Sequence, residues 1–294
     1  MISRVTAPGM TQAAMRHLQA NLSELARLQE QATSQRAFSA PSEDPAAAAT
    51  ALGLHAEQRR VEQYRRNIDD GLAWVTTIDS AITASTSLLG RARDLTVQGS
   101  NDGALDATAK EAIAVELEGI RAELFAKANT SLLGRTVFAG TSDAGAAFAA
   151  DYSFNGATGS EVVRRLSDSA TVRVDMNGAE VFGEGAASVF ALLDNVVADL
   201  RSGVNTGARL GEIDQRLTTM LSAQGAVGAR QSQIERARGA QLADSVSLEA
   251  RRAGVEDVDS VEVLVRLQAQ ELVYRSALAV TGRVLQPSLL EYLR

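Results

Sequence analysis

The chain has 294 residues, a formal net charge of −7 and no cysteine, which excludes disulfides and thiolate metal sites. The acidic balance and the lack of a long basic run disfavour nucleic acid and anionic membranes as partners, and no window of about 18 apolar residues predicts a membrane span. Aromatic residues make up only 4% of a chain that is 45% hydrophobic, so small aliphatic side chains must pack its core, as in closely spaced long helices.

The first predicted element is an amphipathic helix over residues 8–34. Its apolar side chains recur at alternating three- and four-residue steps: Met15, Leu18, Leu22 and Leu25. This spacing places them on one helix face. The first residues lack the apolar core and cleavage site of a signal peptide, which leaves a cytoplasmic protein or export without a cleaved signal.

A long second helix is predicted to begin at Pro45, with Asp44 as its N-cap, and to run to about Gln98. A seven-residue repeat runs along it: Val61, Ile68, Val75, Ile82 and Leu89. Such a helix would span roughly 80 Å, which suits a bundle or fibre subunit. Gly71 costs it about 1 kcal/mol relative to alanine. A turn at 99–103 then predicts an antiparallel helix over 105–129.

The middle of the chain has a different character. Glycine-rich turns separate short β-type runs at residues 136–139, 151–154, 170–175 and 180–182. Asn177-Gly178 lies between the last two runs and predicts a two-residue hairpin turn. The region is predicted to be a small β-rich insert in an otherwise helical chain.

Helical patterns return near Ser188 with a short amphipathic helix from Val189 to Leu200. A turn at 203–207 follows, and a second long helix is then predicted to start near Leu210 and run to about Arg252. Gly254 is expected to break it, and the last helix is expected to span about Asp259 to Leu285. The predicted fold is mainly α, an elongated antiparallel helical bundle with a small β-rich insert. Its predicted parts are an N-terminal assembly helix with its spoke, two halves of a rod around the insert, and a C-terminal assembly helix: residues 1–44, 45–130, 131–186, 187–253 and 254–294.

Apolar stripes at both ends favour assembly over catalysis. Breaks near Pro41 and Gly254 separate the end helices from the rod, so in a monomer they have only each other, and a single short helix is marginal in water. They are therefore expected to gain order when they pack against neighbours. The residues predicted to form the assembly interface are Met15, Leu18, Leu22, Leu25, Val261, Leu264, Val265, Leu272, Leu278 and Leu285.

Catalysis has little support in the sequence. His17 and His55 are the only histidines and lie on different predicted helices, whereas a two-histidine metal site needs adjacent turns. Asp69-Asp70 and the Asp257/Asp259 pair fit a solvated face and a helix start, since no nucleophile accompanies them. No catalytic, cofactor or metal site is predicted, and no cofactor is expected.

Several segments together resemble one bacterial family. They are residues 38–46, 66–68, 79–82, 93–95, 137–141, 227–230, 256–259 and 285–293. In order and spacing, this set is similar to flagellin and its junction relatives. Residues 137–141 and 177–183 favour the hook–filament junction proteins of the hook-associated type 3 family over flagellin. The resemblance covers nearly the whole chain, although its middle region is compact.

The resemblance implies a secreted structural protein of the extracellular flagellum. Such proteins are exported unfolded, masked by an export chaperone on the C-terminal helix, and form a ring of copies between the type 1 hook-associated protein and flagellin. Two other functions stay open: a minor flagellin that polymerises without limit, and a soluble coiled-coil binding module of another class. The sequence predicts neither nucleic-acid binding nor membrane insertion.

Overall fold

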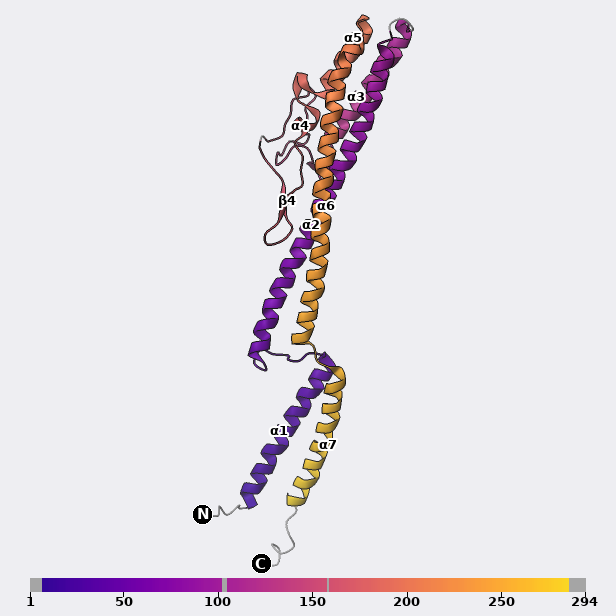
Figure 1. The fold of residues 1–294 in the computed structure, drawn as a ribbon. Helices are drawn as coiled ribbons and strands as arrows, with labels where there is room; N and C mark the ends of the chain where they lie inside the picture. The colour runs from indigo at the N-terminus through magenta and orange to yellow at the C-terminus, as the bar shows by residue number, and fades with distance from the viewer. Residues whose placement is uncertain (1–6, 102–104, 158, 286–294) are drawn as a thin grey trace, which may run out of the picture. The chain divides into compact units, whose positions relative to one another are not determined.

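The computed structural model of the protein describes residues 7–101, 105–157 and 159–285 (Figure 1). The chain divides into two compact units. We call residues 61–243 the body, and residues 1–60 together with 244–294 the terminal unit. Two long helices, α2 (Pro45–Gly99) and α6 (Leu210–Glu256), contribute to both units.

In the body, α2 and α6 run antiparallel (Figure 1). Arg93 Nε donates to Asp214 Oδ1 at 2.5 Å, and Gln224 Nε2 donates to Thr83 Oγ1 at 2.9 Å. Ten residues along α2 therefore match ten residues in the opposite direction along α6. The predicted repeat on α2 is confirmed as core, since these members of it are at most 1% exposed: Ile68, Val75, Ile82 and Leu89.

Two shorter helices pack within the body: α3 (Ala107–Ala128) and α5 (Val189–Ser202). Their first turns are capped by Asp106 and Ser188, whose side chains accept hydrogen bonds from Ala109 N and Ala191 N. The helices pack against each other. Buried aliphatic side chains face inward from both: Ile113, Leu117, Ile120 and Leu124 on α3, and Leu192, Leu193, Val196 and Leu200 on α5.

The insert contains two small antiparallel hairpins. Their strands are β1 (Ser131–Leu132) paired with β2 (Arg135–Thr136), and β3 (Val163–Arg165) paired with β4 (Thr171–Arg173). A cluster of phenylalanines fills the space beneath them. Phe138 and Phe182 meet edge to face with centroids 5.3 Å apart, and Phe148 meets Phe190 at 5.5 Å. The rings that are scarce elsewhere in the chain are concentrated where short strands cannot supply an aliphatic core.

The hairpin predicted at Asn177-Gly178 is wrong. Asn177 is the N-cap of a short helix, α4 (Gly178–Phe182), and its side chain accepts a hydrogen bond from Ala179 N at 3.0 Å. An asparagine can cap a helix as well as begin a turn. Packing of the core favours the helix over the turn, because the helix buries Val181 and Phe182, which are 2% and 0% exposed.

The β3–β4 hairpin is fixed to α2 by polar contacts. Arg164 Nε donates to Asp70 Oδ2 at 2.5 Å, and the Tyr64 hydroxyl donates to Asp168 Oδ1 at 2.7 Å. Asp69 lies 3.7 Å from Arg238 on α6. Both carboxylates of the Asp69-Asp70 pair thus face arginine side chains, and the pair serves packing between elements.

The insert packs closely on α2 at Gly71. A Cβ atom at this position would lie 3.3 Å from Val174 Cγ1 and 3.7 Å from Ile234 Cδ1. The sequence indicates a helix-weakening glycine, and the structure gives its reason. Without a side chain here, Val174 packs directly on the helix and is fully buried.

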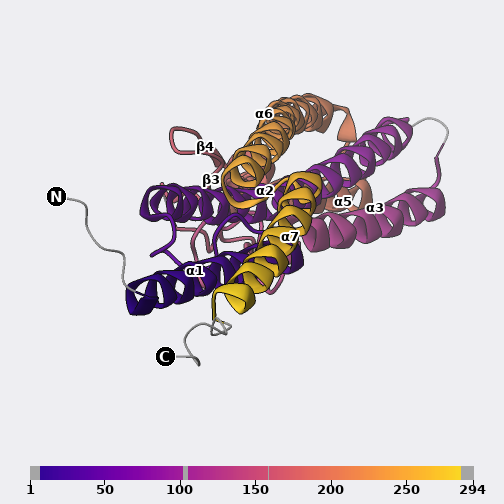
Figure 2. The ribbon, with the colours of Figure 1, turned by 90° about the horizontal axis from the view of Figure 1, so that it is seen from below.

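In the terminal unit, α1 (Ala7–Ser34) and α7 (Ser260–Leu285) lie side by side (Figures 1 and 2). Asp44 Oδ1 accepts from Ala47 N at 2.9 Å and caps α2, as predicted. Asp259 Oδ1 accepts from Val261 N at 2.9 Å and caps α7. The Asp257/Asp259 pair is therefore partly a helix start, as its acidic sequence indicated.

The segment that follows α1 forms backbone hydrogen bonds with the segment between α6 and α7. Ala37 N donates to Glu256 O at 2.7 Å, and Val258 N donates to Gln35 O at 3.2 Å. We call these two backbone bonds the clasp. The break expected at Gly254 lies instead after Glu256, because the clasp replaces the helical hydrogen bonds there.

Glu256 anchors the clasp with its side chain. Its Oε1 lies 2.6 Å from His55 Nε2 on α2, and its Oε2 accepts from Arg252 Nη1 at 2.9 Å. Burial alone would raise the pKa of Glu256, but the hydrogen bonds from Arg252 and His55 hold that pKa below its usual value. The partner of His55 is therefore a carboxylate that stays ionised at neutral pH.

The predicted fold class is confirmed: the described residues are mainly helical, with small β elements only in the middle of the chain. The five-part division of the chain stays a prediction. The boundaries between the body and the terminal unit fall inside α2 and α6.

Gly71 and Gly90 offer a matched test of this packing. Both lie in α2, and a Cβ at Gly90 would meet nothing within 4 Å. Leucine at either position improves helix propensity by up to about 1 kcal/mol. At Gly71 it must also displace Val174, so we expect G71L to be less stable than G90L by about 1–3 kcal/mol. Urea unfolding measures the difference, and equal stabilities would contradict the close approach.

Candidate assembly interface

The N-terminal helix α1 contacts α7 through one face. Leu28 is only 3% exposed, and Leu18 and Leu25 are half-buried. The other two residues predicted on this helix, Met15 and Leu22, are 55% and 50% exposed. The predicted stripe therefore straddles the edge of the contact, with two leucines inside it and two side chains beside it.

The C-terminal helix α7 contacts α1 through a row that the sequence analysis missed. The row consists of one buried and four half-buried side chains: Val263, Leu267, Gln270, Tyr274 and Ala277. Val263 is 6% exposed, and Gln270 Nε2 donates to Asn21 O at 3.3 Å. These positions also recur at three- and four-residue steps, which is the signal that could have found them. We call this row, together with Leu18, Leu25 and Leu28 of α1, the seam.

The predicted residues of α7 lie on other faces and are exposed. They are Val261, Leu264, Val265, Leu272 and Leu278, with exposed fractions from 43% at Leu278 to 73% at Val261. We call these five side chains the outer stripe. Leu285 is the last residue of α7, and its side chain lies outside the described residues. A helix with apolar side chains on several faces needs more than one packing neighbour to bury them.

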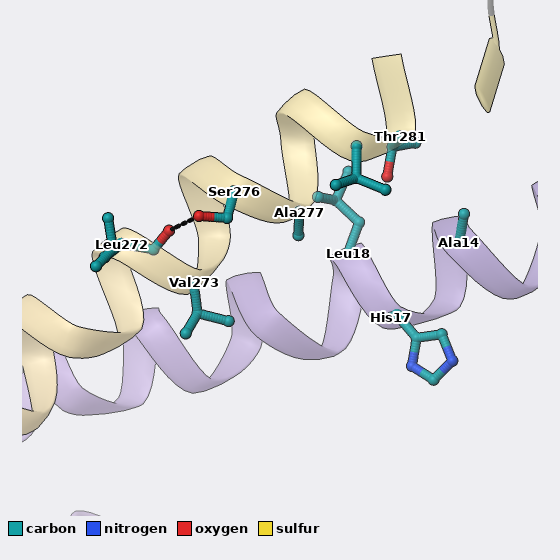
Figure 3. A pocket seen from close by; sticks show the side chains of 9 residues that line it. Ala14, His17, Leu18, Leu272, Val273, Ser276, Ala277 and Thr281 are labelled. Atoms are coloured by element: carbon teal, nitrogen blue, oxygen red, sulfur yellow. Dashed lines mark hydrogen bonds between the residues drawn. The ribbon is translucent and has the colours of Figure 1, made fainter. Parts of the chain in front are cut away.

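A groove of 540 Å³ runs between α1 and α7. Figure 3 shows Leu18 reaching toward α7, where Leu272, Val273 and Ala277 line the other side. The hydroxyl of Ser276 is satisfied within its own helix, since it donates to Leu272 O at 2.8 Å. The lining is otherwise mostly aliphatic, so the groove can accept apolar side chains but has little polar chemistry to offer.

Groups suited to catalysis or metal binding are not gathered in the described part of the chain. His17 lines the groove and His55 contacts Glu256, so the two histidines lie apart. Among the described residues, no three His, Cys, Asp or Glu side chains are placed to hold a metal ion. None of the helices in that part of the chain has the length and hydropathy to cross a membrane.

The two ends of the chain match two family models. Residues 5–143 match the bacterial flagellin N-terminal helical region, and residues 210–293 match the bacterial flagellin C-terminal helical region. The matches include all of α1 and α7, and leave unmatched only the part of the chain that holds β3, β4, α4 and α5.

Whole-protein comparisons point the same way. The chain is 24% identical to flagellin of Bacillus subtilis over 263 residues, covering 83% of this chain and 84% of that protein. It is 27% identical to flagellar hook-associated protein 3 of Salmonella typhimurium over 197 residues, covering 62% of this chain and 61% of that protein. The match to the hook-associated protein thus spans less than two thirds of that relative.

Solved structures share the fold. A flagellar hook-associated protein of Vibrio parahaemolyticus superposes with a TM-score of 0.68 at 21% identity, covering 73% of this chain and all of that one. FlgL of Bacillus cereus gives a TM-score of 0.59 at 24% identity, covering 68% and 99%. The resemblance found in the sequence is confirmed, and the chain belongs to the flagellin family of bacterial flagellar proteins.

Proposed function

We propose that the chain is a structural adaptor at the flagellar hook–filament junction. It is secreted and works in the extracellular flagellum, where copies of it form a ring between the type 1 hook-associated protein and flagellin. The observation that carries this proposal is the outer stripe of α7. Exposed aliphatic side chains on several faces of a terminal helix are the feature expected of a subunit that packs against several neighbours.

The body supports an adaptor role in a different way. Its core is closed within one chain, since the repeat of α2 from Ile68 to Leu89 and the cluster of four phenylalanines are at most 1% exposed: Phe138, Phe148, Phe182 and Phe190. Assembly surfaces can therefore be concentrated on the terminal helices. The relatives named hook-associated protein 3 support the junction over the filament as the place where the chain works.

A minor flagellin is the second candidate, favoured by the match to Bacillus subtilis flagellin over most of the chain. The two candidates differ in whether the interface closes into a ring or continues as a helix. Seeded polymerisation of the pure protein separates them, because only a flagellin extends its seeds into long filaments.

The outer stripe can be tested by charge. In a strain lacking the gene, hooks should remain while flagellin leaks into the medium unpolymerised, and the wild-type gene should restore filaments. The double variant L264D/L272D should fail to restore them, because carboxylates at the interface would lose their hydration without a partner. The body should stay folded by circular dichroism.

L264M/L272M is the matched control. Methionine keeps an apolar side chain of similar volume at both positions, so this change alters the same two sites without adding charge. L264M/L272M should restore filaments. Motile, filamented cells carrying L264D/L272D would contradict the assignment of the outer stripe.

The terminal pair should be less stable than the body in the free subunit. On α1 and α7, only Leu28 and Val263 reach full burial among the side chains described. Hydrogen exchange on the monomer should therefore show weak protection across Leu18–Leu28 and Val261–Leu278 and strong protection across Ile68–Leu89. Equal protection of the three segments would rule out ordering on assembly.

The outer stripe also fits a small export chaperone that masks it before secretion. An exposed apolar helix face of this kind aggregates unless it is covered. Truncation after Gly254 removes α7 and should abolish chaperone binding, measured by co-purification. Retained binding would place the chaperone elsewhere on the chain.

A further inference from the structure

A second candidate site lies in the body. A pocket of 430 Å³ opens between α6 and the segment that joins β4 to α4. Its volume falls within the roughly 300–1,000 Å³ of small-ligand sites. Arg173 and Arg230 contribute guanidinium groups, while Met176, Val181 and Ala223 contribute apolar walls.

The two arginines differ in how their charges are balanced. Arg173 Nε donates to Asp175 Oδ1 at 3.0 Å, and its Nη1 donates to Glu161 Oε1 at 2.9 Å. Asp175 is fully buried and also accepts from Val162 N at 2.8 Å. The carboxylate of Asp175 is therefore already occupied by Arg173 and by the backbone.

Arg230 has no such carboxylate. Among the described residues, its one hydrogen bond goes to the backbone, where Nη1 donates to Asp175 O at 2.8 Å, and no ion pair engages it. Burial, and then the positive charge of Arg173, hold the pKa of Arg230 below its usual value. A half-buried guanidinium with most of its N–H donors unused favours a bound oxyanion.

The surroundings limit what that anion can be. Glu180 lines the same pocket and accepts from Asn177 Nδ2 at 3.3 Å. Glu161 and Asp175 lie close enough to act on the charge of Arg230. These three carboxylates repel a dianion such as phosphate more than a single carboxylate. The apolar walls suit the methylene stem of an acidic side chain.

We propose that this pocket receives a glutamate or aspartate side chain from a neighbouring protein, with its carboxylate bound by Arg230. Two of the hydroxyls that line the pocket are already engaged, because Thr218 and Thr219 donate to Asp214 O and Gln215 O within α6. We take the neighbouring protein to be another flagellar subunit. Only this identification of the partner rests on the proposed function. The pocket and its carboxylate chemistry stand on the body alone.

The site is tested on the full chain with a capped glutamate, N-acetyl-glutamate methylamide. The methyl signal of Met176, which lines the pocket, reports occupancy by NMR in every variant. We expect saturation with a dissociation constant on the order of millimolar, and binding at least about tenfold weaker in R230Q. The capped glutamine analogue, which lacks the charge, should not bind.

Two controls make the test decisive. R236Q removes an exposed arginine from the same helix, outside the pocket, and should bind the capped glutamate as the wild type does. Inorganic phosphate at equal ionic strength should bind more weakly than the capped glutamate. An unchanged response in R230Q, or tighter binding of phosphate, would overturn the site.

The neighbour is tested in cells. Filaments on R230Q cells should form but detach at lower shear than filaments on R236Q cells. If the capped glutamate binds and the two strains shear alike, the docking of a neighbour is overturned while the site stands. This outcome is separate from the outer stripe, whose failure would leave the titration unchanged.

Discussion

The antiparallel register of α2 and α6 is the constraint on which the rest of the structure depends. Polar contacts at Arg93–Asp214 and Thr83–Gln224 share a constant offset, and between them lie side chains with no exposure at all, such as Leu89 and Met220. A slip of one residue would turn those side chains out of the core. Because the register is fixed, the insert can dock at one place, where Gly71 has no side chain to keep it away.

The terminal helices obey a different balance. Each is long enough to form, but their seam buries few side chains fully, and the outer stripe of α7 is left in water. Small aliphatic residues on several faces of α7 let neighbours approach from more than one direction. The clasp of Ala37 and Val258 with the end of α6 constrains where both helices leave the long helices. The weak seam and the clasp together hold α1 and α7 side by side. The outer stripe of α7 stays exposed and is available for assembly.

Much of the fold could be predicted from the sequence, because the helices are marked by the regular spacing of their apolar residues and by capping residues at their starts. The heptad row through Ile68 and Ile82, together with the cap at Asp44, was enough to place α2. The seam on α7 was not found because two apolar rows share that helix, and only a partner helix decides which row is inside. Asn177 was misassigned because its local chemistry allows both a turn and a cap, and the phenylalanine core makes the choice.

Arg230 escaped sequence analysis for a related reason. One arginine among the 29 basic residues carries no signal until the fold shows which carboxylates are already taken. Asp175 could have balanced it, but Val162 N and Arg173 occupy that carboxylate first. Glu161, Asp175 and Glu180 lie near enough to favour the charge of Arg230, but its half-buried guanidinium bonds to a backbone carbonyl, not to one of these carboxylates. Desolvating a charge without a bonded partner lowers stability, so a carboxylate from a neighbouring subunit would complete the site that we propose.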